Sequence, residues 1–168
     1  MLQYIGELGR YLTSMPPSPK DKDHTLRLAF GNGMRKDIWL DFKHRFNIKT
    51  IVEFYGSTEG PVALANYQQH DEYGVGSMGR LGFFQSIFTP MRIVEFNVVK
   101  EEPIRNSKGF AQQCKVGDVG ELVGSIQKLP GLDFKGYKGA KKQTEKKILT
   151  DLFKKGDAWF RTGNVNLV

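Results

Sequence analysis

The sequence has little cysteine and no long apolar run, and each shortage excludes a class of protein. Its 168 residues include a single cysteine, Cys114, which excludes an internal disulfide framework and a cysteine-based zinc cluster and favours an intracellular, reducing compartment. The longest apolar stretches, near residues 81–88 and 93–99, fall well below the ~18 residues that a membrane-spanning helix needs. The first residues lack the basic start and apolar run of a signal peptide. We therefore expect no anchor or leader here, and both ends read as cut from a longer chain.

The composition is that of an ordinary globular protein with a basic bias. The 19 glycines follow no three-residue period, which excludes a collagen-like chain, and twelve Phe, six Tyr and two Trp supply bulk for a core. Lys and Arg number 25 against 18 Asp and Glu, a net charge of +7. Residues 135–155 hold eight of the lysines. Such a run is typical of a solvated face, and the alternative is contact with an acidic membrane surface or another polyanion.

Apolar spacing predicts an α/β half followed by a β-rich half. We expect a helix over residues 2–13, a loop over 14–23, a strand over 24–30, a helix carrying Met34, Ile38, Phe42 and Phe46, and a strand over 48–54. This order favours a parallel sheet. The later part turns glycine-dense near residues 74–82, and strands are expected over 92–99 and 121–126. We place the domain boundary there, with residues 1–78 as an α/β subdomain and 79–168 as a β-rich, distorted barrel-like one.

The most informative segment is the hexapeptide Tyr55-Gly56-Ser57-Thr58-Glu59-Gly60. It follows an apolar strand, and open α/β sheets bind ligands at the carboxyl ends of their strands. Glycines let a backbone approach a ligand, hydroxyls and amides suit phosphate oxygens, and a glutamate is a hard oxygen ligand that Mg²⁺ accepts. The alternative is a polar turn that closes a strand.

A second glycine-bearing loop, Gly31-Asn32-Gly33, follows the other apolar strand. By itself it indicates a plain turn, because Asn-Gly turns are common. In a parallel sheet, however, both loops would lie at the same edge. No other constellation stands out: the three histidines show no metal-ligand spacing, and no Ser-His-Asp or Cys-His arrangement is legible.

Three segments in this order resemble one family. They are Gly31-Asn32-Gly33-Met34-Arg35, the hexapeptide of residues 55–60, and Phe160-Arg161-Thr162-Gly163-Asn164 after Gly156-Asp157. Together they resemble adenylate-forming enzymes, and in particular their fatty acid transport protein, or very-long-chain acyl-CoA synthetase, branch. The hexapeptide is fairly specific to the superfamily. The Gly-Asn-Gly-Met-Arg segment and Tyr4-Ile5-Gly6-Glu7-Leu8 point to the branch.

The resemblance implies a two-step ligase that uses ATP, Mg²⁺ and coenzyme A. A fatty carboxylate and ATP give an acyl-adenylate and pyrophosphate, and the thiol of coenzyme A then displaces AMP. It implies that Gly31, Asn32 and Gly33 line the adenine, that Tyr55 stacks beside the base, and that Gly56 and Ser57 belong to the same nucleotide-binding loop. By the same resemblance Thr58 contacts the α-phosphate, Glu59 holds Mg²⁺, and residue 164 meets the ribose hydroxyls.

The chain also departs from the family. No segment resembles its glycine- and threonine-rich phosphate loop, its mobile lid with the catalytic lysine, or its hydrophobic anchor. At residue 164 the family has Asp, whereas this chain has Asn, and an amide offers one acceptor where a carboxylate would accept from both hydroxyls. We expect the chain to be an internal part of such an enzyme that is inactive on its own.

Two alternatives stay open beside the fatty acid ligase. One is a catalytically inactive remnant, and the other is an adenylate-forming ligase for a different carboxylic acid. The resemblance places the whole protein at the endoplasmic reticulum, peroxisomal or plasma membrane, with fatty acid and coenzyme A as substrates. We expect no nucleic acid partner, because the lysines are not interleaved with stacking aromatic rings apart from Phe134 and Tyr137. The apolar residues Phe83, Phe84, Ile87 and Phe88 would line an acyl tunnel or belong to ordinary core.

Overall fold

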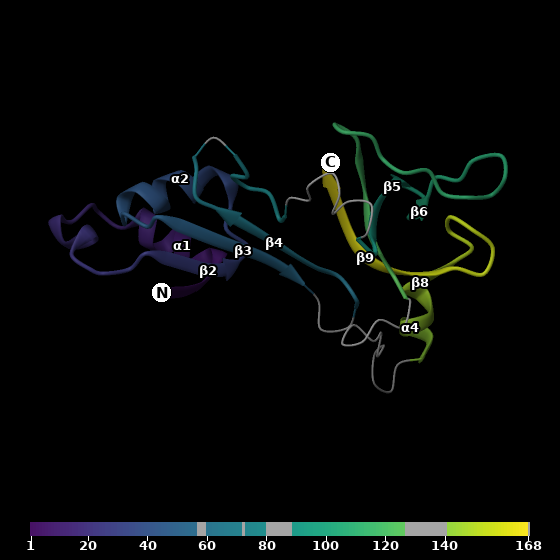
Figure 1. Cartoon of the computed structure of the whole chain (residues 1–168), viewed down its shortest axis with the longest axis horizontal. Coiled ribbons are helices and arrows are strands. Elements are labelled where there is room, and N and C mark those ends of the chain that lie inside the picture. The colour runs from purple at the N-terminus through teal and green to yellow at the C-terminus, as the bar shows by residue number, and fades with distance from the viewer. Residues whose placement is uncertain (57–59, 72, 80–88, 127–140, 168) are drawn as a thin grey trace. The chain divides into compact units, whose positions relative to one another are not determined.

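The chain forms two compact units, each with its own sheet (Figure 1). The computed structural model describes residues 1–56, 60–71, 73–79, 89–126 and 141–167. The first unit comprises Met1–Gly56 and Ala63–Gly82, and the second comprises Ser57–Val62 and Phe83–Val168. The mixed α/β class is confirmed. The assignment of residues 1–78 to an AMP-binding subdomain stays a prediction.

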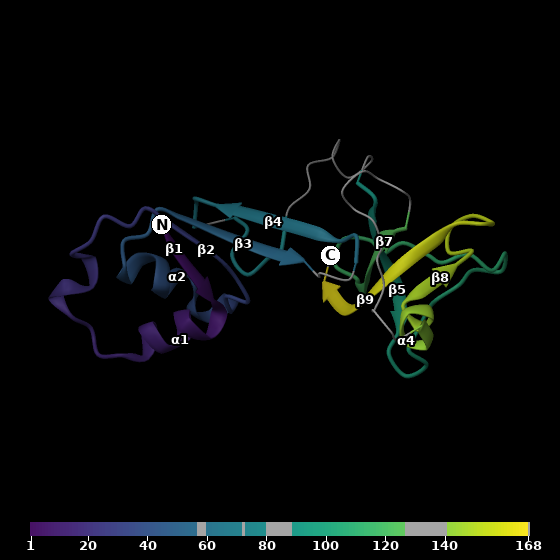
Figure 2. The same ribbon diagram turned by 90° about the horizontal axis from the view of Figure 1, so that it is seen from below.

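The first unit is a four-stranded sheet with two helices on one face (Figure 2). Its strands lie in the order β1 (Leu2–Ile5), β2 (Leu28–Asn32), β3 (Thr50–Gly56) and β4 (Ala63–Gln68). The first three are parallel and β4 runs antiparallel to β3. The helices are α1 (Gly6–Ser14) and α2 (Lys36–Arg45), and a 3₁₀ turn, η1, covers Pro19–Lys22.

The core of the first unit lies between its sheet and its helices. Trp39 and Phe42 on α2 pack with Ala29 of β2 and Ile51 of β3, and all four are at most 1% exposed. Burial of such side chains contributes about 1.5–3 kcal/mol each. This core fixes α2 against the sheet, and it thereby fixes the end of the loop that joins β2 to α2.

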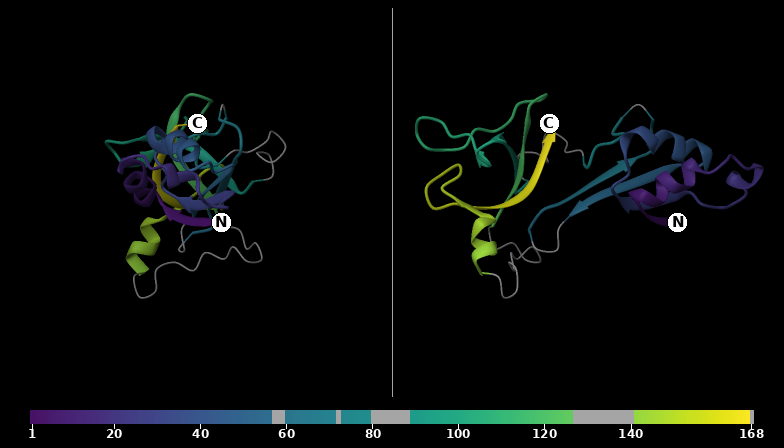
Figure 3. Two further views of the ribbon diagram at one scale, coloured as in Figure 1. Left: turned by 90° about the vertical axis from the view of Figure 1, so that its left-hand side faces the viewer. Right: turned by 180° about the vertical axis from the view of Figure 1, so that it is seen from behind.

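The described part of the second unit, coloured green to yellow in Figure 3, is built on an antiparallel sheet. Its strands have the spatial order β6-β5-β7-β9-β8. The strands are β5 (Met91–Asn97), β6 (Glu102–Pro103), β7 (Val119–Ser125), β8 (Ile148–Thr150) and β9 (Ala158–Leu167), and α4 covers Lys141–Lys146. Val94, Ala111, Val123 and Leu152 form its core. The β9 ribbon is strongly bent (Figure 1), which agrees with the expected distorted β-rich lobe.

Several sequence-based expectations need correction. Residues 2–5 form a strand, not the start of a helix, because β1 pairs with β2 and the helix begins only at Gly6. Gly31 and Asn32 belong to β2, so the turn begins later than expected. We expected a parallel sheet, but the sheet is mixed because β4, which the sequence did not predict, pairs antiparallel with β3. Within the described residues, no helix is long and apolar enough to cross a membrane.

Candidate functional site

Two of the predicted loops meet at the carboxyl edge of the first sheet. β2 and β3 are parallel neighbours, with Leu28 opposite Thr50 and Gly31 opposite Glu53. The segment Gly31-Asn32-Gly33 and the pair Tyr55-Gly56 therefore leave the sheet at one edge. This confirms the expected placement of the two loops. Ligand roles for these residues stay predictions.

A row of three residues crosses this edge on the face that carries the helices. Tyr4 of β1 lies opposite Gly31 of β2, and Gly31 lies opposite Glu53 of β3. The Tyr4 hydroxyl donates a hydrogen bond across the glycine to the Glu53 carboxylate at 2.5 Å. A Cβ on Gly31 would stand 2.6 Å from the Tyr4 ring and 2.1 Å from its carbonyl oxygen. The close approach of the Tyr4 backbone and ring to Gly31 thus requires a glycine at this position.

Glu53 fixes the start of the loop that follows β2. Its side chain is 5% exposed, and Oε1 accepts a hydrogen bond from the Met34 amide at 3.1 Å. Burial raises the pKa of this carboxyl above its ordinary value, with the donated hydrogen bonds opposing the rise. Burial and the neighbouring carboxylate also raise the pKa of the Tyr4 phenol. This carboxylate holds the loop at the sheet edge through neutral donors.

Gly33 is required by both its backbone angle and its packing. Its φ is +78°, a value that favours glycine. Its carbonyl oxygen lies so near Gly6 that a Cβ on Gly6 would stand only 1.7 Å away. The first turn of α1 therefore presses on the loop after β2, and the Gly6–Gly33 pair allows that approach.

The hexapeptide begins in the first unit and ends in the second. Tyr55 and Gly56 are the last residues of β3, whereas Ser57, Thr58 and Glu59 lie outside the described residues. Gly60 packs closely against the ring of Phe160 in β9, where a Cβ would stand 2.2 Å from a ring carbon. The last glycine of the motif is thus required by contact with the strand that carries Thr162 and Asn164.

β9 bulges at the motif that the sequence singled out near the C-terminus. Glu121 of β7 lies opposite Val165, and Val123 lies opposite Arg161, so the three residues from Thr162 to Asn164 face Leu122 alone. Gly163 has a φ of +76°. Bulges of this kind bend a strand and re-aim a side chain. Here the bulge brings the Asn164 side chain to an exposed position.

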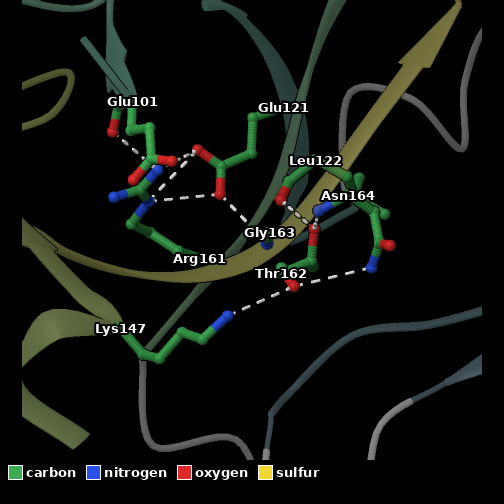
Figure 4. A network of polar contacts seen from close by, with 8 residues as sticks. All are labelled: Glu101, Glu121, Leu122, Lys147, Arg161, Thr162, Gly163 and Asn164. Carbon is green, nitrogen blue, oxygen red and sulfur yellow. Dashed lines mark hydrogen bonds and ion pairs between the residues drawn. The ribbon is translucent and has the colours of Figure 1, made fainter. Parts of the chain in front are cut away.

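The bulge is fastened by a network of polar contacts (Figure 4). The Glu121 carboxylate, 0% exposed, accepts a hydrogen bond from the Gly163 amide at 3.0 Å and forms an ion pair with Arg161 at 3.1 Å. The Thr162 hydroxyl donates to the carbonyl of Leu122 at 2.8 Å and accepts from the Asn164 amide at 3.1 Å. Arg161 also donates to the carbonyl of Glu101 and lies over the Phe96 ring.

Asn164 stands beside a cation at the outer side of the bulge. Its side-chain nitrogen and the ammonium of Lys147 each lie 3.5 Å from the carbonyl oxygen of Thr162, as Figure 4 shows. Both nitrogens are directed at that carbonyl. The outer side of the bulge therefore carries a positive charge and one amide acceptor oxygen, where a carboxylate at residue 164 would offer two acceptor oxygens.

The remaining candidates from the sequence carry ordinary contacts. His44 pairs with Asp71 at 2.6 Å, and His24 accepts from the Leu26 amide. Burial raises the pKa of the Cys114 thiol, with nearby carboxylates adding to the shift. Among the described residues no group of three His, Cys, Asp or Glu could hold a metal ion. The proposed acyl-tunnel residues Phe83, Phe84, Ile87 and Phe88 lie outside the described residues.

Sequence reasoning missed Glu53 and Glu121, the two carboxylates that accept hydrogen bonds from the Met34 and Gly163 amides of the candidate loops. A signal was present, because each is a charged residue inside an apolar strand, in Ile-Val-Glu-Phe and Gly-Glu-Leu-Val. Charged residues are almost never fully buried unless they are paired. An acid at an inward position of a predicted core strand therefore indicates a fixed partner.

Sequence comparison relates the whole chain to fatty acid transport proteins. It is 41% identical over 168 residues to the rat long-chain fatty acid transport protein 2, covering 100% of this chain and 26% of that protein. It is 41% identical to the yeast very long-chain fatty acid transport protein, covering 98% of this chain and 25% of the relative. The chain thus spans about a quarter of the length of these relatives, and the predicted resemblance is confirmed. No family model matches the chain.

Solved structures with the same fold are adenylate-forming enzymes. An ATP-bound RpMatB-BxBclM chimera superposes with a TM-score of 0.66 at 19% identity over 99% of this chain and 28% of the other. The Vibrio cholerae adenylation domain AlmE, in complex with glycyl-adenosine-5'-phosphate, gives 0.60 at 19% identity over 98% and 29%. A benzoate CoA ligase from Burkholderia xenovorans gives 0.59 over 98% and 28%. At this identity the likeness shows the fold.

Proposed function

We propose that this chain forms part of the nucleotide site of an AMP-forming fatty acid–CoA ligase of the fatty acid transport branch. In the first step a carboxylate oxygen attacks the α-phosphorus of ATP, which forms the acyl-adenylate bond and releases pyrophosphate. In the second step the thiol of coenzyme A attacks the acyl carbon. A thioester forms, the acyl–phosphate bond breaks, AMP leaves and the thiol proton is lost.

The observation that carries the proposal is the whole-length identity to fatty acid transport proteins. The geometry supports it independently. Two loops meet at the carboxyl edge of parallel strands, which is where open α/β sheets bind ligands. In the other unit a bulge, held by hydrogen bonds from the Thr162 hydroxyl and the Gly163 amide, carries Asn164 at an exposed position.

Each loop has a defined task in this proposal. Gly31, Asn32 and Gly33 offer the adenine a flat backbone wall that Glu53 and Tyr4 hold still. Tyr55 presents its ring to the base. Gly56, Ser57 and Thr58 supply amides and hydroxyls to the phosphates, whose charge rises as the α-phosphorus is attacked. Asn164 meets the ribose hydroxyls.

Mg²⁺ belongs to the proposal through Glu59 alone. A glutamate oxygen is a ligand that Mg²⁺ accepts together with nucleotide phosphates, and Glu59 directly follows the phosphate-facing Thr58. When bound, the ion would neutralise developing phosphate charge. Glu59 lies outside the described residues, so the assignment rests on its chemistry and its place in the motif.

A fatty acid is the substrate that the relatives favour. The matching relatives are named as long-chain and very long-chain fatty acid transport proteins, whereas ligases for benzoate and other acids share only the fold. The whole protein then works at the endoplasmic reticulum, peroxisomal or plasma membrane, where its apolar substrate partitions. Lipid transport follows, because a thioester of coenzyme A does not leave through the bilayer.

A segment exchange tests the proposal. The quarter of the rat protein that this chain matches is replaced by the 168 residues, and formation of the thioester from a long-chain fatty acid, ATP and coenzyme A is measured beside the host. We expect turnover comparable to that of the host and none from the chain alone. A folded exchange protein that forms no thioester, beside an active host, would overturn the proposal.

One observation favours a second candidate, a binding protein without turnover. Asn164 stands where the resembling family has a carboxylate, and loss of a charge-assisted hydrogen bond costs about 1.5–3 kcal/mol. In this case the exchange protein binds AMP and makes no product, and Asn164→Asp restores product. The two candidates therefore separate in one assay.

A further inference from the structure

We propose that Glu121 is a positioning residue, which holds the β9 bulge so that Asn164 is presented to the ribose. This inference rests on the proposed function for the identity of the ligand. The contacts of Glu121 with Gly163 and Arg161 are present without any ligand. Glu121 is not accessible to a ligand, since it is 0% exposed. It acts through the backbone of Gly163.

The bulge has a conformation that a strand does not keep unaided. Three residues of β9 face one residue of β7, so the regular ladder of backbone hydrogen bonds is interrupted there. Gly163 lies at positive φ, and its amide would otherwise lack a strand partner. The Glu121 carboxylate supplies that partner at 3.0 Å. A charged acceptor makes this bond stronger than a backbone carbonyl would.

Arg161 neutralises the buried charge of the Glu121 carboxylate and fixes the orientation of that carboxylate. Its Nε lies 3.2 Å from both carboxylate oxygens and its terminal nitrogen 3.1 Å from one of them. The guanidinium is itself held by the carbonyl of Glu101 and the ring of Phe96. The carboxylate therefore cannot rotate away from the Gly163 amide. Thr162 closes the other side of the bulge through Leu122 and Asn164.

The hold predicts a separation between stability and ligand selectivity. Replacing a buried ion pair by apolar residues of similar volume is often neutral or stabilising. The double variant Glu121→Leu with Arg161→Leu should therefore fold, yet it has no acceptor for the Gly163 amide. The double variant Glu121→Gln with Arg161→Gln keeps one acceptor oxygen, and without the arginine that oxygen is free to take the amide. It serves as the rescue.

The matched control is a pair in the other unit. Arg45 and Asp21 are 12% and 17% exposed and pair at 2.8 Å. Asp21→Leu with Arg45→Leu removes the same charges from the chain without touching the bulge.

The experiment measures two quantities on the full 168-residue chain and these variants by nuclear magnetic resonance. The first is hydrogen-exchange protection of the Gly163 amide without ligand. The second is the ratio of the affinities for AMP and for 2',3'-dideoxy-AMP, which lacks the hydroxyls. In the wild-type chain and the control we expect a protected amide and a preference for AMP of about tenfold, worth one hydrogen-bonded hydroxyl pair. In the Leu–Leu variant both vanish while the melting temperature stays within a few degrees, and the Gln–Gln variant recovers both.

Each result decides the matter. If the Leu–Leu variant keeps the protection or the preference, Glu121 does not position the bulge, and the proposed function stands. If the wild-type chain binds both nucleotides equally, or binds neither, the ribose assignment is wrong, and the inference is overturned together with that part of the proposed function.

Discussion

In both units a buried strand carboxylate fixes a loop for which we propose a role in nucleotide binding, and this carboxylate has a different partner in each unit. In each, a buried strand carboxylate accepts a backbone amide from a loop that includes a glycine at positive φ: Glu53 takes Met34, and Glu121 takes Gly163. The Glu53 carboxylate has a neutral partner, the Tyr4 hydroxyl, which donates a hydrogen bond to it, and burial raises the pKa of Glu53. Glu121 is balanced by the guanidinium of Arg161. The first hold is therefore sensitive to protonation, and the second depends on keeping both charges.

The largest effect should come from replacing Glu121 while its partner Arg161 is kept. Glu121→Leu alone leaves Arg161 buried to 20% exposure beside no carboxylate, and an uncompensated charge of this kind costs about 3–5 kcal/mol. The free energy of unfolding of the second unit should fall by that amount. The indole signals of Trp39 and Trp159 report one unit each, so denaturation followed at both signals assigns the loss. An equal loss at both would contradict the separate roles of the two units.

The next effect concerns binding at the second unit. Asn164→Asp should raise the affinity for ATP by about 1.5–3 kcal/mol, roughly ten- to a hundredfold, because a carboxylate accepts from both ribose hydroxyls. The nearby ammonium of Lys147 offsets the added charge. Calorimetry in the exchange protein measures the gain. Binding of 2',3'-dideoxy-ATP is the control, and an equal gain there would refute the ribose assignment.

A smaller loss of stability should follow from placing a side chain at Gly31, between Tyr4 and Glu53. Gly31→Ala places a methyl group against the Tyr4 ring and carbonyl, and overpacking of this kind costs about 1–3 kcal/mol. The loss should appear in the first unit, at the Trp39 signal. With Tyr4→Ala the ring is gone, so the double variant should cost less than the sum of the two singles. Strict additivity would show that the ring does not press on Gly31.

The smallest effect is the response of the first hold to pH. A raised folded pKa means that the folded chain binds the Glu53 proton more tightly than the unfolded chain, whose ordinary value is 4.5. The stability that this group contributes is therefore complete below 4.5 and is lost as pH rises through the folded pKa. Urea titrations between pH 4 and 8 measure the slope at the Trp39 signal. Glu53→Gln should flatten it, and an unchanged slope would assign it to other groups.

Much of the fold was predictable because its signals are local. The apolar spacing of Ile38 and Phe42 predicted α2, and the apolar run before Tyr55 predicted β3, which placed two loops at one sheet edge. The strand β1 was misread because its four residues also fit a helical spacing and only pairing with β2 decides between the two.

The strand β4 and the two holds were not predictable, because distant partners create them. Asn66 and Gln68 in β4 are buried at 2% exposure, and no apolar alternation marks them. The side-chain nitrogen of Asn66 donates to the carbonyl of Gly74, and the side-chain oxygen of Gln68 accepts from the indole of Trp39. Polar side chains that are satisfied by tertiary contacts look like loop residues in a sequence. For the same reason the motif residues were found by resemblance, whereas Glu53 and Glu121 needed the structure.

A titration of the isotope-labelled 168-residue chain with AMP tests most directly the nucleotide-binding roles that we propose for the loop after β2, for Tyr55 and for Asn164. We predict that the amide signals of Gly33, Tyr55, Gly163 and Asn164 shift with a single dissociation constant, while those of Asp71 and His44 do not shift. Shifts confined to the lysine-rich residues 141–155, or to one unit alone, would contradict it and identify a general anion-binding surface instead.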